Sequence, residues 1–229
     1  MKTIGLIGGM SWESSSLYYR IINEEIKKRL GGFHSAKCIL YSVDFEEIEL
    51  YQRKGQWDEA GAVLAEAAHG LEAAGADFIL ICTNTMHKVA GRIQRQINIP
   101  LLHIADITAD KVLKAGIRKI GLLGTRYTME QDFYKSRLEA KGIKVLVPVE
   151  ADRAIVNSVI FNELCLGQIN TASRDKYRDI IKWLTEQGAE GIILGCTEIG
   201  LLVKQDDSTV PLFDTTLIHA MGAVDFALE

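Results

Sequence analysis

The feature that most constrains this chain is an eleven-residue pattern that occurs twice. Residues 75–85 read GADFILICTNT and residues 188–198 read GAEGIILGCTE. Each copy has a Gly-Ala-acid turn, then an apolar run short enough for a strand buried on both faces, then small polar residues. Open α/β sheets bind their ligands where the strands emerge at their carboxyl ends. The two copies therefore predict two equivalent strand ends that carry chemistry.

A gap-free alignment of the two copies decides which residues correspond. Thr83 and Cys196 each lie 8 residues after the first glycine of their copy, so they are equivalent. Cys82 falls on Gly195 instead. Because neighbouring residues of a strand point to opposite faces, we expect Cys82 to be structural.

The repeat extends over most of the chain. Residues 5–9 (GLIGG) are echoed by residues 121–125 (GLLGT), and residues 99–103 (IPLLH) by residues 210–214 (VPLFD). A repeat this long indicates a duplicated domain rather than a solenoid. Strands alternate with helices through both copies, which predicts two pseudo-symmetric α/β lobes, each with a central, mostly parallel sheet flanked by helices.

The sequence also predicts where the chain passes between the lobes. No Pro-, Gly- or Ser-rich linker separates them, so we expect crossings at ordinary loops near residues 100 and 207. The first lobe is then residues 1–99 plus 208–229, and the second lobe is residues 100–207. In that arrangement the last helix returns to the first lobe.

The expected elements follow from hydrophobic periodicity and turn residues. Strands are expected at residues 3–7, 36–43, 77–82, 100–103, 121–125, 142–147, 191–195 and 210–214. Helices are expected at residues 14–30, 58–74, 86–96, 129–140, 152–166 and 172–187. Residues 44–53 are expected to be a polar loop or a short helix.

Composition excludes several classes of protein. The chain has 229 residues, 48% hydrophobic and 24% charged, which is typical of a globular protein with a sizeable core. The formal net charge of −4 and the absence of a basic block argue against a nucleic-acid partner. The N-terminus leads directly into a strand and no apolar run is long enough to span a membrane, so we expect a cytoplasmic protein.

The four cysteines, Cys38, Cys82, Cys165 and Cys196, have no Cys-x-x-Cys spacing, so neither a disulfide framework nor a metal site is indicated. Cys196 stands where a buried run stops and polar residues begin. A thiol beside a helix N-terminus has a lowered pKa, which predicts a reactive thiolate at Cys196. The alternative is a small buried hydrophobic residue, the commonest fate of a free cysteine.

Other polar residues cluster at loop positions near the predicted strand ends. The glycines of Gly5-x-x-Gly8-Gly9 suggest a backbone nest for a carboxylate, and Thr125 supplies a hydroxyl at the equivalent loop. For both loops the alternative is a tight strand-to-helix turn. Gln52 and Arg53 are expected at the end of a loop that covers the cleft between the two predicted sets of strand ends. The alternative for Arg53 is a solvated side chain.

His87 has two interpretations. It lies in the expected first turn of the helix after the first copy of the pattern, where it could act as a proton shuttle or hydrogen-bond donor. Equally, it could be a structural residue at the start of the helix with no proton role.

Four motifs together resemble the aspartate/glutamate racemase family, over essentially the whole chain. They are Gly8-Gly9-Met10-Ser11-Trp12, Thr83-Asn84-Thr85-Met86-His87, Leu123-Gly124-Thr125-x-x-Thr128 and Gly195-Cys196-Thr197-Glu198-Ile199. The resemblance implies a racemase or isomerase that needs no cofactor, built of two α/β lobes with the substrate between them, and usually dimeric. Relatives use one cysteine from each lobe, one removing the Cα proton and the other returning a proton on the opposite face.

The chain departs from this family pattern at one decisive position. Relatives read Cys-Asn-Thr-x-His where this chain begins with Thr83. A thiol titrates near ~8.5, whereas an alkyl hydroxyl is far less acidic and is a poor base. The resemblance then implies lopsided chemistry, with Cys196 as the base for the L-enantiomer and Thr83 as the proton donor.

The resemblance also implies the substrate contacts. Met10 and Ser11 match the loop that lines the site, Asn84, Thr85 and Thr197 match residues that hold the α-carboxylate and amino group, and Thr125 matches a contact from the second lobe. Gln52 and Arg53 are the nearest equivalents of an arginine that binds the acidic side chain. A lysine of another relative falls near Cys165, where this chain has no cation.

Two further readings stay open. The same fold serves broad-specificity amino-acid racemases, hydantoin racemases and maleate isomerases. A two-lobed protein that only binds a small molecule, with an inert Cys196, is the alternative from a different class.

Overall fold

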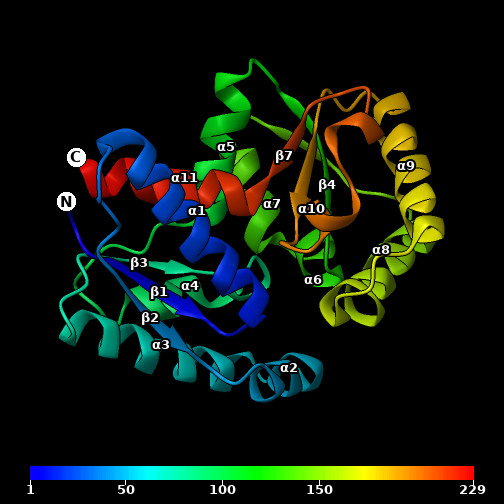
Figure 1. Cartoon of the computed structure of the whole chain (residues 1–229). Helices are drawn as coiled ribbons and strands as arrows, with labels where there is room; N and C mark the ends of the chain where they lie inside the picture. The colour runs from blue at the N-terminus through cyan, green and yellow to red at the C-terminus, as the bar shows by residue number, and fades with distance from the viewer. The chain divides into compact units, whose positions relative to one another are not determined.

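A computed structural model describes all residues of the chain, Met1–Glu229. The chain folds into two compact units (Figure 1). Unit 1 is Met1–Ile104 with His219–Glu229, and unit 2 is Ala105–Ile218. The boundaries lie after Ile104 and Ile218, which is 5 and 11 residues beyond the boundaries expected after residues 99 and 207.

Unit 1 is built on a three-stranded parallel sheet of order β2-β1-β3. Its elements are β1 (Ile4–Gly8), α1 (Trp12–Leu30), β2 (Cys38–Ser42), α2 (Phe45–Lys54), α3 (Trp57–Ala73), β3 (Phe78–Ile81), the 3-10 helix η1 (Thr85–Val89) and α4 (Ala90–Gln94). Residues of α11 (Thr215–Leu228) from His219 onward also belong to it.

The faces of this sheet are covered by different helices (Figure 1). Ile4, Leu6, Phe78 and Leu80 pack with α1 and α11, whereas the alternate residues Ile7, Ile79 and Ile81 pack with α3 and α4. Because side chains alternate along a strand, a short run that is apolar at every position fills two separate cores. Both faces of the sheet are packed with apolar side chains, so polar side chains are found beyond the strand ends.

Unit 2 repeats this plan with one more strand, in a parallel sheet of order β5-β4-β6-β7. Its elements are α5 (Ile104–Lys114), β4 (Lys119–Gly124), α6 (Arg126–Glu130), α7 (Asp132–Ala140), β5 (Lys144–Leu146), α8 (Glu150–Asn162), η2 (Leu164–Leu166), α9 (Thr171–Glu186), β6 (Ile192–Gly195), α10 (Ile199–Leu202), η3 (Gln205–Asp207), β7 (Leu212–Asp214) and the start of α11. In order of pairing, β1, β2 and β3 correspond to β4, β5 and β6. The expected fold class, two duplicated α/β lobes with parallel sheets, is confirmed.

Local signals explain where several helices begin. The Ser11 hydroxyl accepts a hydrogen bond from the backbone N–H of Ser14 at 3.3 Å and so caps α1. The side chain of Asp44 caps α2 in the same way, through the N–H of Glu46 at 3.2 Å. Residues 44–53, expected as a loop or short helix, are therefore mostly helix.

Two short elements differ from the expectation, and one expected strand belongs to the other unit. The helix expected at residues 86–96 is a 3-10 turn followed by the short α4. The strand expected at residues 100–103 is a single bridge between Ile79 and Leu101. Its repeat partner, β7, is a true strand paired with β6, so residues 210–214 belong to unit 2 and not to the first lobe as expected.

No helix of the chain combines the length and the hydropathy that crossing a membrane requires.

Candidate functional site

The loops after β1 and β3 lie at the same edge of the unit 1 sheet. These strands are parallel neighbours, and their paired residues run to Ile7 and Ile81. The Ser14 hydroxyl in the first turn of α1 donates to the Cys82 carbonyl at 2.7 Å, which ties the two loops together. The predicted residues Met10 and Ser11, and the segment 83–85, are thus brought to one place in unit 1.

Within this segment the exposure of the residues differs sharply. Thr83 is half-buried, whereas Asn84 and Thr85 are buried. Cys82 is buried in the cluster that contains Leu80 and Tyr18, and burial raises the pKa of its thiol. A thiol in that state is not a base, as expected for a structural Cys82.

Gln52 and Arg53 do not act as a pair, because both lie on α2 and neighbouring residues of a helix point in different directions. The Gln52 side chain is buried, and its amide Nε2 donates to the Met86 Sδ at 3.1 Å, beside the loop after β3. Arg53 is exposed, with a long ion pair of 3.9 Å to Glu49. The structure brings Gln52 to the predicted site loops and leaves Arg53 at the surface.

The glycine loop after β1 is a tight turn. The Gly9 N–H donates to the Ser15 hydroxyl at 2.8 Å, so this amide is occupied within the protein and is not aimed at an anion. Gly9 has φ +92°, and a Cβ there would collide with the backbone of Val43. The expected carboxylate nest at this loop is therefore replaced by the alternative, a strand-to-helix turn.

In unit 2, Thr125 and Cys196 follow neighbouring strand ends. Gly124 of β4 is paired with Gly195 of β6, and each is followed directly by one of these residues. The Thr125 hydroxyl caps α6 by accepting from the N–H of Thr128 at 3.3 Å. Thr197 is buried beside the half-buried Cys196. The three predicted residues of unit 2 thus lie together at one sheet edge.

The environment of the Cys196 thiol differs from the expectation. The Sγ donates to the Glu198 Oε2 at 3.0 Å, and Glu198 is itself buried. Burial, followed by the negative charge of Glu198, raises the pKa of Cys196 well above its usual range. The helix that follows, α10, has only 4 residues and offers little compensating dipole. The expected lowered thiol pKa is wrong for the free protein, where Cys196 rests as a thiol.

Cys165 and Tyr177 complete the surroundings of Cys196. Cys165 and Cys196 both pack against the cluster that contains Tyr177 and Val156. The Tyr177 hydroxyl donates to the Val156 carbonyl at 3.1 Å, and burial raises the pKa of that hydroxyl. On this side, Cys196 packs against an apolar cluster.

Two residues in contact with predicted site residues were not assigned a role by the sequence. Glu198 contacts the thiol, and a carboxylate two residues after a cysteine at a strand end was the available signal. His87 contacts the Thr83 carbonyl through its Nδ1 at 2.8 Å. The sequence left its role open because spacing alone does not show which atom a side chain reaches.

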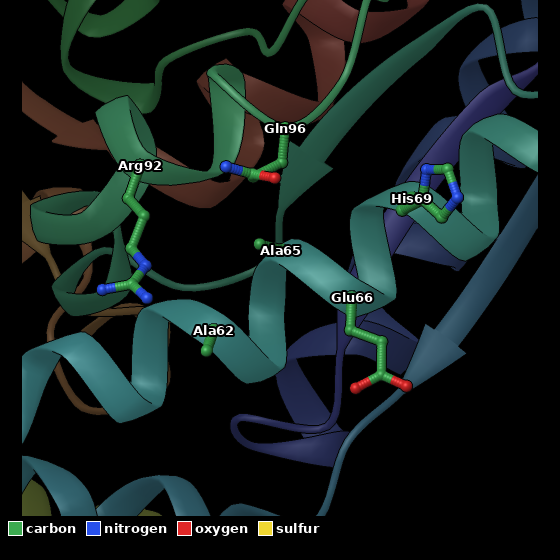
Figure 2. A pocket seen from close by; sticks show the side chains of 6 residues that line it. All are labelled: Ala62, Ala65, Glu66, His69, Arg92 and Gln96. Carbon is green, nitrogen blue, oxygen red and sulfur yellow. The ribbon is translucent and has the colours of Figure 1, made fainter.

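Unit 1 also has a surface pocket. Figure 2 shows its lining from α3, α4 and Gln96, which follows α4. Its lining residues are Ala62, Ala65, Glu66, His69, Arg92 and Gln96. Arg92 is already paired with Asp58 at 2.6 Å. None of the predicted site residues lines this pocket, so it is not the candidate site.

The chain is similar to known proteins over almost its whole length. Residues 7–223 match the Asp/Glu/Hydantoin racemase family. A candidate Asp/Glu racemase from Yersinia pestis is 60% identical, with a TM-score of 0.95 and full coverage of both chains. An aspartate racemase homologue from Pyrococcus horikoshii OT3 is 39% identical, with a TM-score of 0.85 and full coverage of both chains. The broad specificity amino-acid racemase RacX of Bacillus subtilis is 24% identical and covers 96% of each chain.

Proposed function

Because this chain belongs to the Asp/Glu/hydantoin racemase family and is therefore an enzyme that racemises amino acids, we propose that it acts on aspartate or glutamate. The reaction runs without pyridoxal phosphate or another cofactor, and its initial rate favours the L-to-D direction. Cys196 removes the Cα proton and Thr83 delivers a proton to the opposite face. The observation that carries this proposal is the pair of equivalent strand ends, of which only one bears a thiol, held against a carboxylate.

Proton abstraction begins with the Cys196–Glu198 contact. The thiol proton moves along the existing hydrogen bond to the Glu198 carboxylate, which leaves a thiolate. A substrate ammonium group near the thiolate favours this charged form. The thiolate then takes the Cα proton, and the electron pair is delocalised into the substrate carboxylate. Glu198 later releases its proton to solvent, and the thiol carries the proton that came from Cα.

Proton delivery falls to Thr83. Its hydroxyl proton goes to Cα on the other face, and water returns a proton to the alkoxide, so protons balance over the cycle. In the reverse direction the same hydroxyl has to act as a base, for which an alcohol is poorly suited. The equilibrium constant stays at unity, because enantiomers have equal free energy in water. A unit equilibrium constant also makes kcat/KM equal for the two enantiomers, so the bias is one of kcat and is seen in initial rates at saturating substrate.

The remaining predicted contacts are proposed as substrate ligands. Ser11, Thr85, Thr125 and Thr197 offer hydroxyls and Asn84 an amide to the carboxylate and ammonium group, with Met10 and Gln52 lining the site. Arg53 is proposed to bind the acidic side chain. Its exposed ion pair with Glu49 at 3.9 Å contributes at most ~1 kcal/mol, so it is readily exchanged for a substrate carboxylate.

A second candidate is a broad-specificity racemase. The half-buried Cys165 stands near Cys196 where a cation for an acidic side chain would be expected, and RacX is named for broad specificity. Chiral chromatography of a panel of amino acids, a hydantoin and maleate separates this candidate from the acidic one. Turnover of neutral amino acids as fast as that of aspartate would favour it. Family membership excludes the alternative of a protein that only binds its ligand.

Solvent exchange tests the proposed roles most simply. L-aspartate and L-glutamate are incubated with the enzyme in D2O, and loss of the Cα proton is followed by NMR. We expect exchange with the wild-type enzyme and near-complete loss of exchange in Cys196→Ser. Cys38→Ser is the matched control, because that thiol lies on β2. Exchange that persists in Cys196→Ser would assign the base to another residue.

We further propose a cytoplasmic homodimer. The edge strand β2 exposes Leu40 and Tyr41, and the neighbouring helix α1 exposes Trp12 and Tyr19. An apolar edge strand without charge or proline invites pairing with a second copy. The helix α1 has an acidic first turn and a basic last turn, so two antiparallel copies bring opposite charges together. Light scattering should then give twice the chain mass of 25.4 kDa.

A further inference from the structure

Three buried histidines lie together in unit 1. The side chains of His87, His103 and His219 are almost fully excluded from solvent. The His87 ring lies edge-on to both others, with ring centroids 4.6 Å from His103 and 5.6 Å from His219. The proposed reaction assigns no role to any of them.

The hydrogen bonds of His87 fix its tautomer. Its Nδ1 lies 2.8 Å from the Thr83 carbonyl oxygen, which can only accept, so Nδ1 carries the proton. The backbone N–H of Ile104 donates to its Nε2 at 3.2 Å, so Nε2 has no proton. An imidazolium ion has no acceptor for that amide, and the ring is therefore neutral in this arrangement.

The neighbouring ring of His219 is fixed in the same manner. Its Nε2 donates to the Leu102 carbonyl at 2.9 Å, and its Nδ1 accepts from the Tyr18 hydroxyl at 2.8 Å. Burial lowers the pKa of His219 to about 4, so this ring also stays neutral. The neutral ring of His219 therefore packs against His87 and leaves the hydrogen bonds of His87 unchanged.

We propose that His87 is a positioning residue that anchors the Thr83 carbonyl and thereby holds the Thr83 hydroxyl in the geometry for proton delivery. This inference rests on the proposed role of Thr83. Thr83 follows a 4-residue strand and precedes a 3-10 turn, so the His87 bond fixes its peptide where the regular ladder has ended. Proton transfer depends steeply on such placement, since a misplacement of ~1 Å can cost about 100-fold in rate.

The same bonds exclude the proton-shuttle interpretation of His87. A shuttle needs one ring nitrogen free to receive a proton while the other releases one. Here one nitrogen donates to a carbonyl and the other accepts from an amide, neither of which exchanges a proton at neutral pH. His87 therefore acts on the reaction only through the position of Thr83.

Replacing His87 by Asn or by Gln distinguishes the roles of its two ring nitrogens. In His87→Asn the side-chain amide reaches the place of Nδ1 and can donate to the Thr83 carbonyl. In His87→Gln it reaches the place of Nε2 and cannot. Formation of D-aspartate from L-aspartate is measured for both variants and for His87→Ala, with His69→Ala as the control because that histidine is exposed on α3.

We expect kcat for inversion to fall about 100-fold in His87→Ala and His87→Gln, with KM unchanged within about twofold. His87→Asn should recover most of the loss. His69→Ala should match the wild type. If His87→Ala does not fold, the comparison of Asn with Gln still decides. Equal loss in Asn and Gln, or a rise in KM with kcat unchanged, would overturn the positioning role.

The incorporation of deuterium into recovered L-aspartate gives a second measurement, which a partial loss of folded enzyme does not change relative to inversion. In D2O, label that enters recovered L-aspartate passes through Cys196, whereas D-aspartate requires Thr83. The ratio of inversion to return should fall in His87→Gln and stay at the wild-type value in His87→Asn. An unchanged ratio in His87→Gln would also contradict the inference. A wild-type enzyme that shows neither inversion nor exchange would instead disprove the proposed function.

Discussion

At the scale of single residues, the proposed mechanism starts from the Cys196–Glu198 pair. The carboxylate both raises the thiol pKa and accepts its proton at 3.0 Å. These effects oppose each other when Glu198 is neutralised. Removing the charge makes the thiolate easier to form, while removing the carboxylate takes away the proton acceptor. The pair therefore gives a prediction with two readouts of opposite sign.

In Glu198→Gln we expect the pKa of Cys196 to fall, because the neighbouring negative charge is gone. The pH profile of thiol alkylation by iodoacetamide measures this shift. Racemisation of L-aspartate should nevertheless drop by about 100-fold, the typical contribution of a positioned proton acceptor. Glu186→Gln, an exposed residue at the end of α9, controls for the loss of one charge. Undiminished racemisation in Glu198→Gln would remove Glu198 from the mechanism.

At the scale of elements, the strands and long helices could be predicted from sequence because their apolar periodicity is strong. The short elements could not. Pro100 follows Ile99 just as Pro211 follows Val210, yet only the second segment forms a strand, because pairing with a neighbour and not local sequence decides it. Likewise, the sequence alone did not show which face of α2 packs against the core. The structure buries Gln52 and leaves Arg53 exposed.

The equivalence of Thr83 and Cys196 was predictable from sequence, because the repeat aligns them without a gap and places each just beyond a strand of its own unit. The thiol pKa was not predictable, because it depends on Glu198 turning toward the Sγ. The occupied Gly9 amide was hidden for the same reason, since only the fold brings the Ser15 hydroxyl to it.

The free energy of unfolding depends on pH through His219, which lies on α11. Its pKa in the folded protein is about 4, against 6.5 ordinarily. Between these values the unfolded chain binds a proton that the folded chain excludes, so stability falls as pH drops from 6.5 to 4. Above pH 6.5 the effect is absent. Below pH 4 the full loss in the free energy of unfolding is about 3 kcal/mol, because each unit of pKa difference corresponds to about 1.4 kcal/mol.

His219→Gln tests this assignment. The glutamine amide can still donate to the Leu102 carbonyl but does not titrate, and the nearby Tyr18, His87 and His103 are left in place. Urea unfolding of both proteins at pH 7 and pH 4.5 should show the wild type losing about 2 to 3 kcal/mol more than the variant. Parallel losses would show that other groups govern the acid sensitivity.

At the scale of the whole molecule, gene duplication has produced two units of one plan that differ at a decisive point. In unit 1, Thr83 follows β3 after one residue and its carbonyl is held by His87, and in unit 2, Cys196 directly follows β6 and its thiol is held by Glu198. Each of the two residues is thus held by a partner from its own unit. In the proposed mechanism, Cys196 removes a proton and Thr83 only delivers one.

The most direct test of this asymmetry compares initial rates from the two enantiomers. D-aspartate formed from L-aspartate, and L-aspartate formed from D-aspartate, are measured by chiral chromatography for the wild type and for Thr83→Cys. We predict that, with each enantiomer at a saturating concentration, the wild type converts L-aspartate at least ~10-fold faster at the start than D-aspartate, and that Thr83→Cys raises the D-to-L rate, since a thiol can serve as a base. Equal initial rates from the two enantiomers at saturation in the wild type would contradict the proposed assignment of Cys196 as the only effective base.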